Sequence, residues 1–337
     1  MKYIIGKGTA LFAAALLLAA CSSDTADEGK TGSELQVVAY TAAYQETDTP
    51  TRAVTAGYTV YTPDHDLAIG LYVLPEDPPT VKLMRYSSGY WHSQATVVGG
   101  DTYYIYGYMP KQEPITSTIT ELTGGDIQLV LSGVPAVIAD DVCFVTGVKE
   151  KTGDLLQGSF AYVGQSDNNF VRLLMDHLFA SVKLHFTVDA EYATLRNIKL
   201  KSLTLQGTKA SATATVRLRH NTTATDPVQS VTYETEGTSS TATFFESATG
   251  EDLTGATISN YLCCFAPTVG NALTLVSTYD VYDRKGNKIR ENCTATNKLP
   301  NLGAVRGQCV TLNLTVTPTY LYQLSDPDLD NPTVVVN

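Results

Sequence analysis

The sequence predicts an all-β protein built from two β-sandwich domains in tandem. Tyrosine is unusually frequent, with 20 Tyr against 9 Phe and 1 Trp, and only 17% of the residues are charged, a composition that suits half-buried pleated surfaces. Short apolar segments recur between turn residues, as they do in β-sandwiches, and no window sustains a helical periodicity. Because one hydrophobic core seldom extends over 337 residues, we expect two domains.

The first 20 residues have the pattern of a lipoprotein signal peptide. Lys2 and Lys7 precede an apolar run at residues 10–20, which is too short for a permanent membrane span. The run ends in a Leu-Ala-Ala-Cys sequence at residues 18–21, similar to a lipobox, in which small residues precede a cysteine that is acylated. We therefore expect the mature chain to begin at a lipidated Cys21 and to contact the membrane only through this anchor. The alternative is an ordinary signal peptide followed by an incidental cysteine.

The segment after Cys21 is predicted to be a flexible tether over residues 21–34. It contains almost no apolar side chains that could offset the entropy lost on ordering. A first strand follows at residues 35–40, where Leu35, Val37 and Ala39 occupy alternate positions.

We assign the first domain to residues 35–175 and the second to residues 176–317. The clearest strand is predicted at residues 178–188, because every second side chain is apolar and most of the others are polar. Residues 189–195 are a candidate for a short connecting helix. Further strands are predicted at residues 67–73, 90–91, 103–108, 198–205, 212–218, 241–245, 272–282 and 310–316.

The C-terminal tail, residues 318–337, is not assigned to either domain. Pro318 is expected to interrupt the preceding strand, residues 320–324 form a short strand, residues 325–332 are turn-rich, and residues 333–336 form an apolar strand. An apolar strand beyond the last domain suggests a segment that pairs with another molecule. The alternative is that the tail folds back onto its own second domain.

The charge of the chain argues against nucleic acid as a partner. Removal of the signal peptide leaves 21 basic residues against 34 acidic ones, a formal net charge of −13. Such a surface repels phosphate backbones and lacks the clustered Lys and Arg that bind them.

Five cysteines remain after Cys21, and their number is odd. An exported protein can form disulfides, but at least one thiol stays unpaired, and no pair has the spacing of a zinc or redox motif. One disulfide and a set of small buried side chains are both compatible with the sequence. The five are Cys143, Cys263, Cys264, Cys293 and Cys309.

No catalytic or metal-binding motif is complete, so we expect no enzyme activity, no cofactor and no metal. Residues 151–153 and 166–168 are similar to two penicillin-binding motifs, but they stand in the wrong order and the Ser-x-x-Lys sequence is missing. His177 and His185 lack a third ligand at a suitable spacing. Residues 326–331 lack the glycine and the final glutamate of a calcium loop.

A series of motifs resembles the fimbrillin family, the Mfa-like and FimA-like lipoprotein pilins of type V pili. They follow the lipobox and cover most of the first domain and the start of the second. The motifs are Asp-Leu-Ala-Ile-Gly-Leu-Tyr at residues 66–72, Tyr-Trp at 90–91, Tyr-Tyr-Ile-Tyr-Gly-Tyr-Met-Pro at 103–110, and Leu-Met-Asp-His-Leu-Phe-Ala-Ser-Val at 174–182, with the strand around Ile198.

The resemblance implies two transthyretin-like β-sandwich domains and a structural subunit, stalk or tip, of a bacterial surface fimbria. Members of the family are exported as outer-membrane lipoproteins, and an Arg-specific protease then removes the first strand, which opens a groove for a strand of the next pilin. Carried over to this chain, the cut falls between Arg52 and Ala53 and removes the strand with Leu35, Val37 and Ala39. The implied donor residues are Tyr320, Leu321, Tyr322, Leu324, Val334, Val335 and Val336.

Two alternatives stand beside this interpretation. Arg52 is an ordinary loop arginine if the chain is one of the family's anchor members, which are not processed in this way. A surface lipoprotein that binds glycans or nutrients would keep its first strand and present a cluster of Tyr and Trp side chains. The partners expected here are other pilin subunits, and a ligand on a host or bacterial surface is compatible with a tip role.

Overall fold

The structure is a computed structural model that describes residues 32–46, 57–155, 158–220, 226–253, 261–299, 301–320 and 327–337. Its elements are β1 (Gly32–Ala42), β2 (Gln45–Glu46), β3 (Tyr58–Val60), β4 (Ala68–Leu74), β5 (Lys82–Ser87), β6 (Tyr90–Val98), β7 (Thr102–Met109), β8 (Thr116–Glu121), β9 (Ile127–Pro135), β10 (Val137–Ile138), β11 (Cys143–Lys149), β12 (Ala161–Val163), β13 (Phe170–His177), β14 (Ala180–Val188), α1 (Ala190–Leu195), β15 (Arg196–Gly207), β16 (Ser211–Leu218), β17 (Val228–Glu236), β18 (Ser240–Asp252), β19 (Tyr261–Phe265), a 3-10 turn (Pro267–Val269), β20 (Thr274–Asp283), β21 (Lys288–Lys298), β22 (Gln308–Tyr320) and β23 (Pro327–Val336). The prediction of an all-β protein is confirmed, and the short helix predicted at residues 189–195 is α1, whose N-cap is Asp189.

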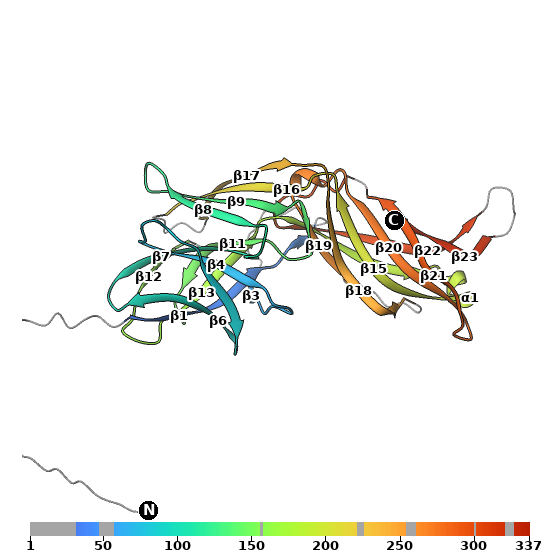
Figure 1. The fold of residues 1–337 in the computed structure, drawn as a ribbon, viewed down its shortest axis with the longest axis horizontal. Coiled ribbons are helices and arrows are strands. Elements are labelled where there is room, and N and C mark those ends of the chain that lie inside the picture. The colour runs from blue at the N-terminus through green and yellow to red at the C-terminus, as the bar shows by residue number, and fades with distance from the viewer. Residues whose placement is uncertain are drawn as a thin grey trace, which may run out of the picture.

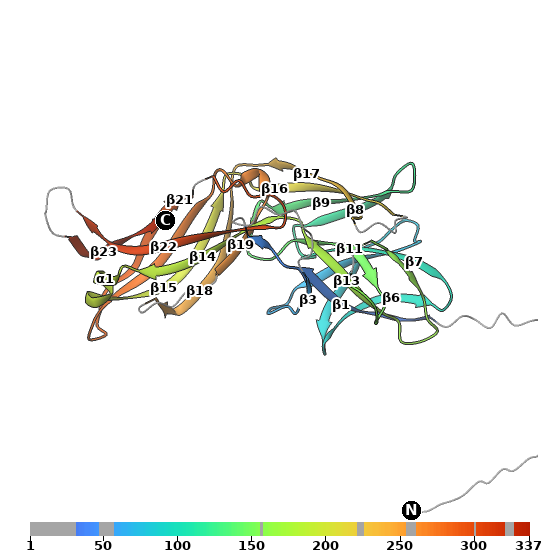
Figure 2. The ribbon, with the colours of Figure 1, turned by 180° about the vertical axis from the view of Figure 1, so that it is seen from behind.

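The strands form two lobes that lie side by side along the long axis of the molecule (Figure 1). In the first lobe, seven strands form a closed ring in the order β11-β13-β1-β6-β5-β4-β7, because β11 pairs with both β13 and β7. A four-stranded sheet, β17-β16-β9-β8, lies over one side of this ring (Figures 1 and 2). The strand β4, from Ala68 to Val73, is buried at every position.

The second lobe consists of two further sheets. One has the order β10-β19-β14-β22-β2, with β23 paired to β22, and the other has the order β18-β15-β20-β21. The alternation predicted at residues 178–188 explains the core, because Val182, Leu184 and Phe186 on β14 are completely buried. No helix in the described ranges is long and apolar enough to cross a membrane.

The two lobes exchange elements, so that they are not separate in sequence. The hairpin β16–β17 comes from the second half of the chain but pairs with β9 over the first lobe. Conversely, β2 and β10 come from the first half and join a sheet of the second lobe. The domain boundary predicted between residues 175 and 176 falls near the end of β13.

Three local predictions differ from the structure. The strand expected to start at residue 178 starts at Ala180, because a bend at residues 178–179 separates it from β13. The strand β22 continues through Pro318 to Tyr320, since Pro318 lies at a register shift in the pairing with β23, where its missing N–H costs no ladder bond. Residues 327–332 are part of β23 and not a turn.

Candidate functional site

The strand β1 lies inside the ring of the first lobe and pairs on both of its edges. Residues 36–41 run parallel to β13, residues 32–37 run antiparallel to β6, and residues 40–42 pair with β3. The alternation predicted for this strand is confirmed, because Leu35, Val37 and Ala39 point into the core with 0% exposure. The opposite side chains are only partly buried. No other strand can take the place of β1 unless β1 leaves the ring.

Polar contacts hold the beginning of β1. The backbone N–H of Gln36 donates to Asn169 O at 2.9 Å, and the Asn169 side chain donates to Ser33 Oγ at 2.7 Å. The Ser93 hydroxyl, in β6, donates to Leu35 O at 3.2 Å. Because Asn169 is completely buried, its hydrogen bonds contribute to fixing the register of this end of the strand.

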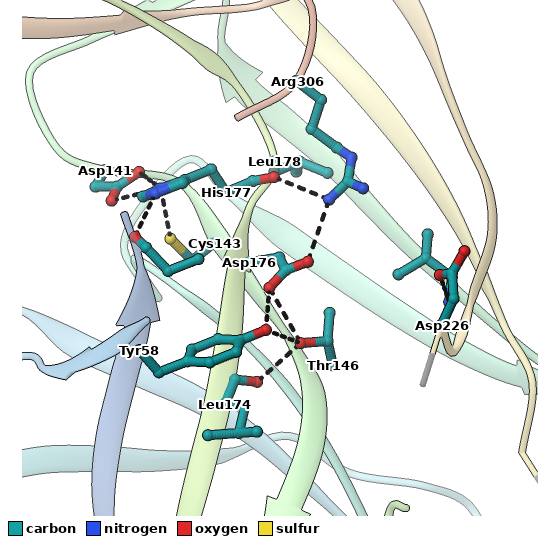
Figure 3. A network of polar contacts seen from close by, with 12 residues as sticks. Tyr58, Asp141, Cys143, Thr146, Leu174, Asp176, His177, Leu178, Asp226 and Arg306 are labelled. Atoms are coloured by element: carbon teal, nitrogen blue, oxygen red, sulfur yellow. Dashed lines mark hydrogen bonds and ion pairs between the residues drawn. The ribbon is translucent and has the colours of Figure 1, made fainter. Parts of the chain in front are cut away.

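The end of β1 contacts a buried polar network at the junction of the lobes (Figure 3). His177 Nε2 lies 2.7 Å from Ala42 O, and His177 Nδ1 lies 2.9 and 3.0 Å from the two oxygens of Asp141. Two residues beyond β1, the ring of Tyr44 stacks on the imidazole with centroids 3.6 Å apart, and its hydroxyl donates to Asp141 Oδ1 at 2.7 Å. Burial raises the pKa of Tyr44 well above its usual value, so the phenol stays protonated and remains a donor.

The short strand β2 extends the same segment into the second lobe. Gln45 and Glu46 run parallel to the first two residues of β22, and the N–H of Gln45 donates to Gly307 O at 2.9 Å. Thr311 donates to the Glu46 carboxylate at 2.9 Å, and Lys183 lies 3.8 Å from it. Residues 42–46 therefore connect β1, the strand predicted to be removable, to both lobes.

Gly57 is the next residue that the structure describes, and the strand that follows it, β3, is anchored separately from β1. The Tyr58 hydroxyl donates to Asp176 Oδ1 at 2.6 Å, and Arg306 Nη1 lies 3.8 Å from the other oxygen of that carboxylate (Figure 3). The predicted cut between Arg52 and Ala53, like the predicted lipidation site Cys21, lies outside the described residues. Both ends of the segment that contains the predicted cut are thus fixed to the body of the protein.

The tail pairs with its own second lobe in this structure. The strand β23 runs antiparallel to the second half of β22, with Val334 opposite Val316 and Val336 opposite Leu314. Side chains from neighbouring elements donate to three of its carbonyls: Tyr192 to Leu329 O, Tyr279 to Pro332 O and Asn297 to Val334 O, at 2.8, 2.6 and 2.5 Å.

The predicted donor residues are unequally covered. Val334 is 4% exposed, Val336 is half-buried and Val335 is 42% exposed. Tyr320 ends β22, whereas Leu321, Tyr322 and Leu324 lie outside the described residues. In contrast to β1, β23 pairs with a single strand, and it occupies the same edge of β22 that β2 covers at its other end.

The cysteines after Cys21 are all buried free thiols, so no disulfide is formed among the residues described. Burial raises the pKa of Cys263 and Cys264, which keeps both thiols protonated and unreactive at neutral pH. Of the two sequence alternatives, small buried side chains fit the structure.

Asp141 and Cys143 are partners of His177 that the sequence did not predict. His177 ends β13 and is 4% exposed. Cys143 Sγ lies 3.5 Å from His177 Nδ1. Only the antiparallel pairing of β11 with β13, in which Cys143 lies opposite His177, brings the two residues together, and the spacing along the chain contains no sign of it.

A cavity of about 520 Å³ lies at the edge of the first lobe, between the β4–β5 loop, β7 and β8. Tyr104 and His220 line it, with ring centroids 4.1 Å apart, together with the acidic residues Glu76, Asp77 and Glu121. Trp91, by contrast, is completely buried in the core, so it is not part of an exposed aromatic cluster.

No protein-family model matches the chain, and no curated protein does. Solved structures similar to it include a fimbrial protein from Bacteroides vulgatus, with 12% identity over 89% of this chain and 98% of that one and a TM-score of 0.39. A proposed cell adhesion protein from Bacteroides fragilis has 13% identity over 90% and 96%, with a TM-score of 0.42. The fimbrial anchor protein Mfa2 from Porphyromonas gingivalis has 12% identity over 89% and 95%, with a TM-score of 0.23.

Proposed function

We propose that this chain is a structural subunit, stalk or tip, of a bacterial surface fimbria that assembles by strand exchange. Each lobe is interpreted as a transthyretin-like β-sandwich domain, and the subunit is exported to the outer membrane with a lipid on Cys21. A protease then cuts after Arg52, the segment that contains β1 and β2 leaves, and a strand from the next subunit takes its place. The fimbrillin resemblance of the sequence motivates this proposal.

The pairing of β1 is the observation that carries the proposal. This strand closes a seven-stranded ring, yet a single cut within residues 47–56 would separate it from β3 and all later strands. Its removal would uncover unpaired backbone groups of β6 and β13 together with the core that Leu35, Val37 and Ala39 cover. A sheet edge of this kind is a ready template for an added strand.

The energetics favour a donor that is tightly held once it enters. Leu35 and Val37 each contribute roughly 1.5–3 kcal/mol through burial, so refilling these two positions alone restores about 3–6 kcal/mol. The ladder bonds on the two flanking strands add to this figure, each by about 0.5–1.5 kcal/mol. A strand that enters the groove and pairs on both edges therefore gains more free energy than β23 gains by pairing with the single edge of β22.

The tail is the proposed donor. Tyr320, Leu321, Tyr322 and Leu324 would form one short donor strand, and Val334, Val335 and Val336 would form the other. Val334 and Val336 have the same two-residue spacing as Leu35 and Val37, so they can fill successive inward positions of the groove. In the free subunit β23 covers the edge of β22, which protects that edge from unspecific pairing before assembly.

Limited digestion with an Arg-specific protease tests the proposal. We expect one new N-terminus at Ala53 and ladder-like oligomers that resist SDS, and we expect Arg52→Ala to abolish both. Arg85→Ala is the matched control, because Arg85 is an exposed arginine on β5 and its loss leaves the cut in place. A monomer that is cut at scattered sites would instead support a surface lipoprotein that binds glycans or nutrients.

A further inference from the structure

Asp141, Cys143 and His177 bring three metal-binding atoms together at the junction of the lobes. One carboxylate oxygen, Cys143 Sγ and His177 Nδ1 lie within 4.8 Å of one another. The side chains of Cys143 and His177 are buried, and that of Asp141 is 17% exposed. Figure 3 shows the imidazole edge directed at both the carboxylate and the sulfur.

The hydrogen-bonding pattern of His177 requires a positive charge between its Nδ1 atom and the Asp141 carboxylate. Its Nε2 lies 2.7 Å from Ala42 O, and because a carbonyl oxygen only accepts, Nε2 carries a proton. In a neutral ring Nδ1 is then a lone pair, yet it faces the Asp141 carboxylate at 2.9 Å, which is also an acceptor. Either a second proton or a metal ion must occupy this position.

The separations fit a metal ion. Zinc binds nitrogen, oxygen and sulfur ligands at roughly 2.0–2.3 Å in a tetrahedron, which places neighbouring ligand atoms roughly 3.2–3.7 Å apart. In the structure Nδ1 lies 3.5 Å from Cys143 Sγ and 2.9–3.0 Å from the carboxylate oxygens, so an ion needs only a small shift of Asp141.

The surrounding groups already hold the ligands as they are held in metal sites. A ligating histidine usually donates its other ring N–H to a carbonyl or carboxylate oxygen. Here Ala42 O is the acceptor of that hydrogen bond from His177 Nε2. The Tyr44 hydroxyl donates to Asp141 Oδ1, which leaves Oδ2 as the ligand atom. Thiolate, imidazole and carboxylate together favour Zn²⁺ over Ca²⁺ or Mg²⁺, which prefer oxygen alone.

We propose that Asp141 Oδ2, Cys143 Sγ and His177 Nδ1 bind one Zn²⁺ ion, with water as the fourth ligand. Binding exchanges protons for the metal: the Cys143 thiol loses its proton to become a thiolate, and any proton on Nδ1 is released to solvent.

Two of the supporting groups lie upstream of the proposed cut. Ala42 O and the Tyr44 ring belong to the segment that includes β1, so a bound ion would stabilise the intact subunit and oppose release of β1. Only this consequence rests on the proposed fimbrial function. The metal site is tested on uncut protein, so its failure is distinguishable from a failure of strand exchange.

Untagged full-length protein, freed of metal with a chelator, should be titrated with Zn²⁺ and, separately, with Co²⁺. We expect one equivalent of Zn²⁺ that survives gel filtration, and thiolate-to-cobalt charge-transfer absorption in the Co²⁺ form. Cys143→Ala should abolish both, and Tyr44→Phe, which removes only the supporting hydroxyl, should weaken binding about 10-fold or more. Cys293→Ala, which removes a buried thiol on β21, should bind like the unaltered protein.

Two results overturn the site. If the folded protein binds less than one equivalent of Zn²⁺, the positive charge beside His177 Nδ1 is a proton and not a metal ion. A Co²⁺ complex without thiolate-to-cobalt absorption places the ion away from Cys143. The spectrum of the unaltered protein decides the question even if Cys143→Ala fails to fold.

Discussion

Truncation of Leu35 should reveal whether β1 supports the fold only until it is cut away. Leu35 is completely buried, and replacing such a leucine by alanine costs about 2–5 kcal/mol in lost burial and cavity formation. In the uncut protein we therefore expect Leu35→Ala to lower the free energy of unfolding by this amount. After processing, the altered residue has left with β1, so the difference between variant and unaltered protein should fall close to zero.

Urea unfolding followed by fluorescence suits this comparison because Trp91 is the only tryptophan of the chain and lies opposite Val37 on β6. Leu83→Ala on β5 is the control, since Leu83 is 45% exposed and its loss should cost about 0.5 kcal/mol or less. A cost of less than about 1 kcal/mol for Leu35→Ala before the cut would show that β1 does not support the fold. An equally large loss in cut, strand-free subunits would also contradict this prediction.

Three further predictions concern the tail, the thiols and acid stability. Deletion of residues 327–337 should leave the cut at Arg52 intact but abolish SDS-resistant oligomers on gels, and oligomers of unchanged size would exclude β23 as the donor. Treatment of native protein with an alkylating reagent at neutral pH should leave Cys263 and Cys264 unmodified in a mass spectrum, because burial raises the pKa of both thiols; rapid labelling would show that the second lobe opens. For Asp280, burial acts to raise the pKa, but hydrogen bonds from the Asn292 N–H and Lys288 outweigh it and lower the pKa overall. Its stabilising contribution is therefore present above the unfolded pKa of about 3.9 and is lost as the pH falls through the lower folded value, so Asp280→Asn should reduce the dependence of stability on pH in that acidic range, as measured by urea unfolding.

The sequence was sufficient for strands whose two faces differ. Residues 180–188 and 310–316 alternate strictly, and both lie in strands that pair on two edges, β14 and β22, where one face must be apolar. The first strand was also predicted from alternation, with the buried positions assigned correctly at Leu35, Val37 and Ala39.

Strands with few buried apolar side chains were missed. The strands β17 and β21 lie at the edges of their sheets, and Cys293 is the one buried side chain among their residues, so their alternation gives little apolar signal in the sequence. The position of Pro318 illustrates a related limit. A proline ends a strand only where its N–H is needed, and whether it is needed depends on the partner strand.

Contacts between segments that are distant in the chain could not be predicted from the sequence. The exchange of the β16–β17 hairpin between the lobes depends on its pairing with β9, and nothing in either segment specifies the other. The network around His177 likewise joins residues from β11, β13 and the segment after β1. Pairing between strands far apart in the chain is set by the packing of the whole fold.

Peptide binding to the processed subunit tests whether loss of β1 opens a groove for the tail. A synthetic peptide of residues 318–337 should be added to subunits that were cut after Arg52 and freed of the first segment, in a form that lacks its own tail, and the complexes weighed by native mass spectrometry. We expect one bound peptide per cut subunit and none on the uncut form, in which β1 fills the ring. Equal binding to both forms, or none to either, would contradict this expectation.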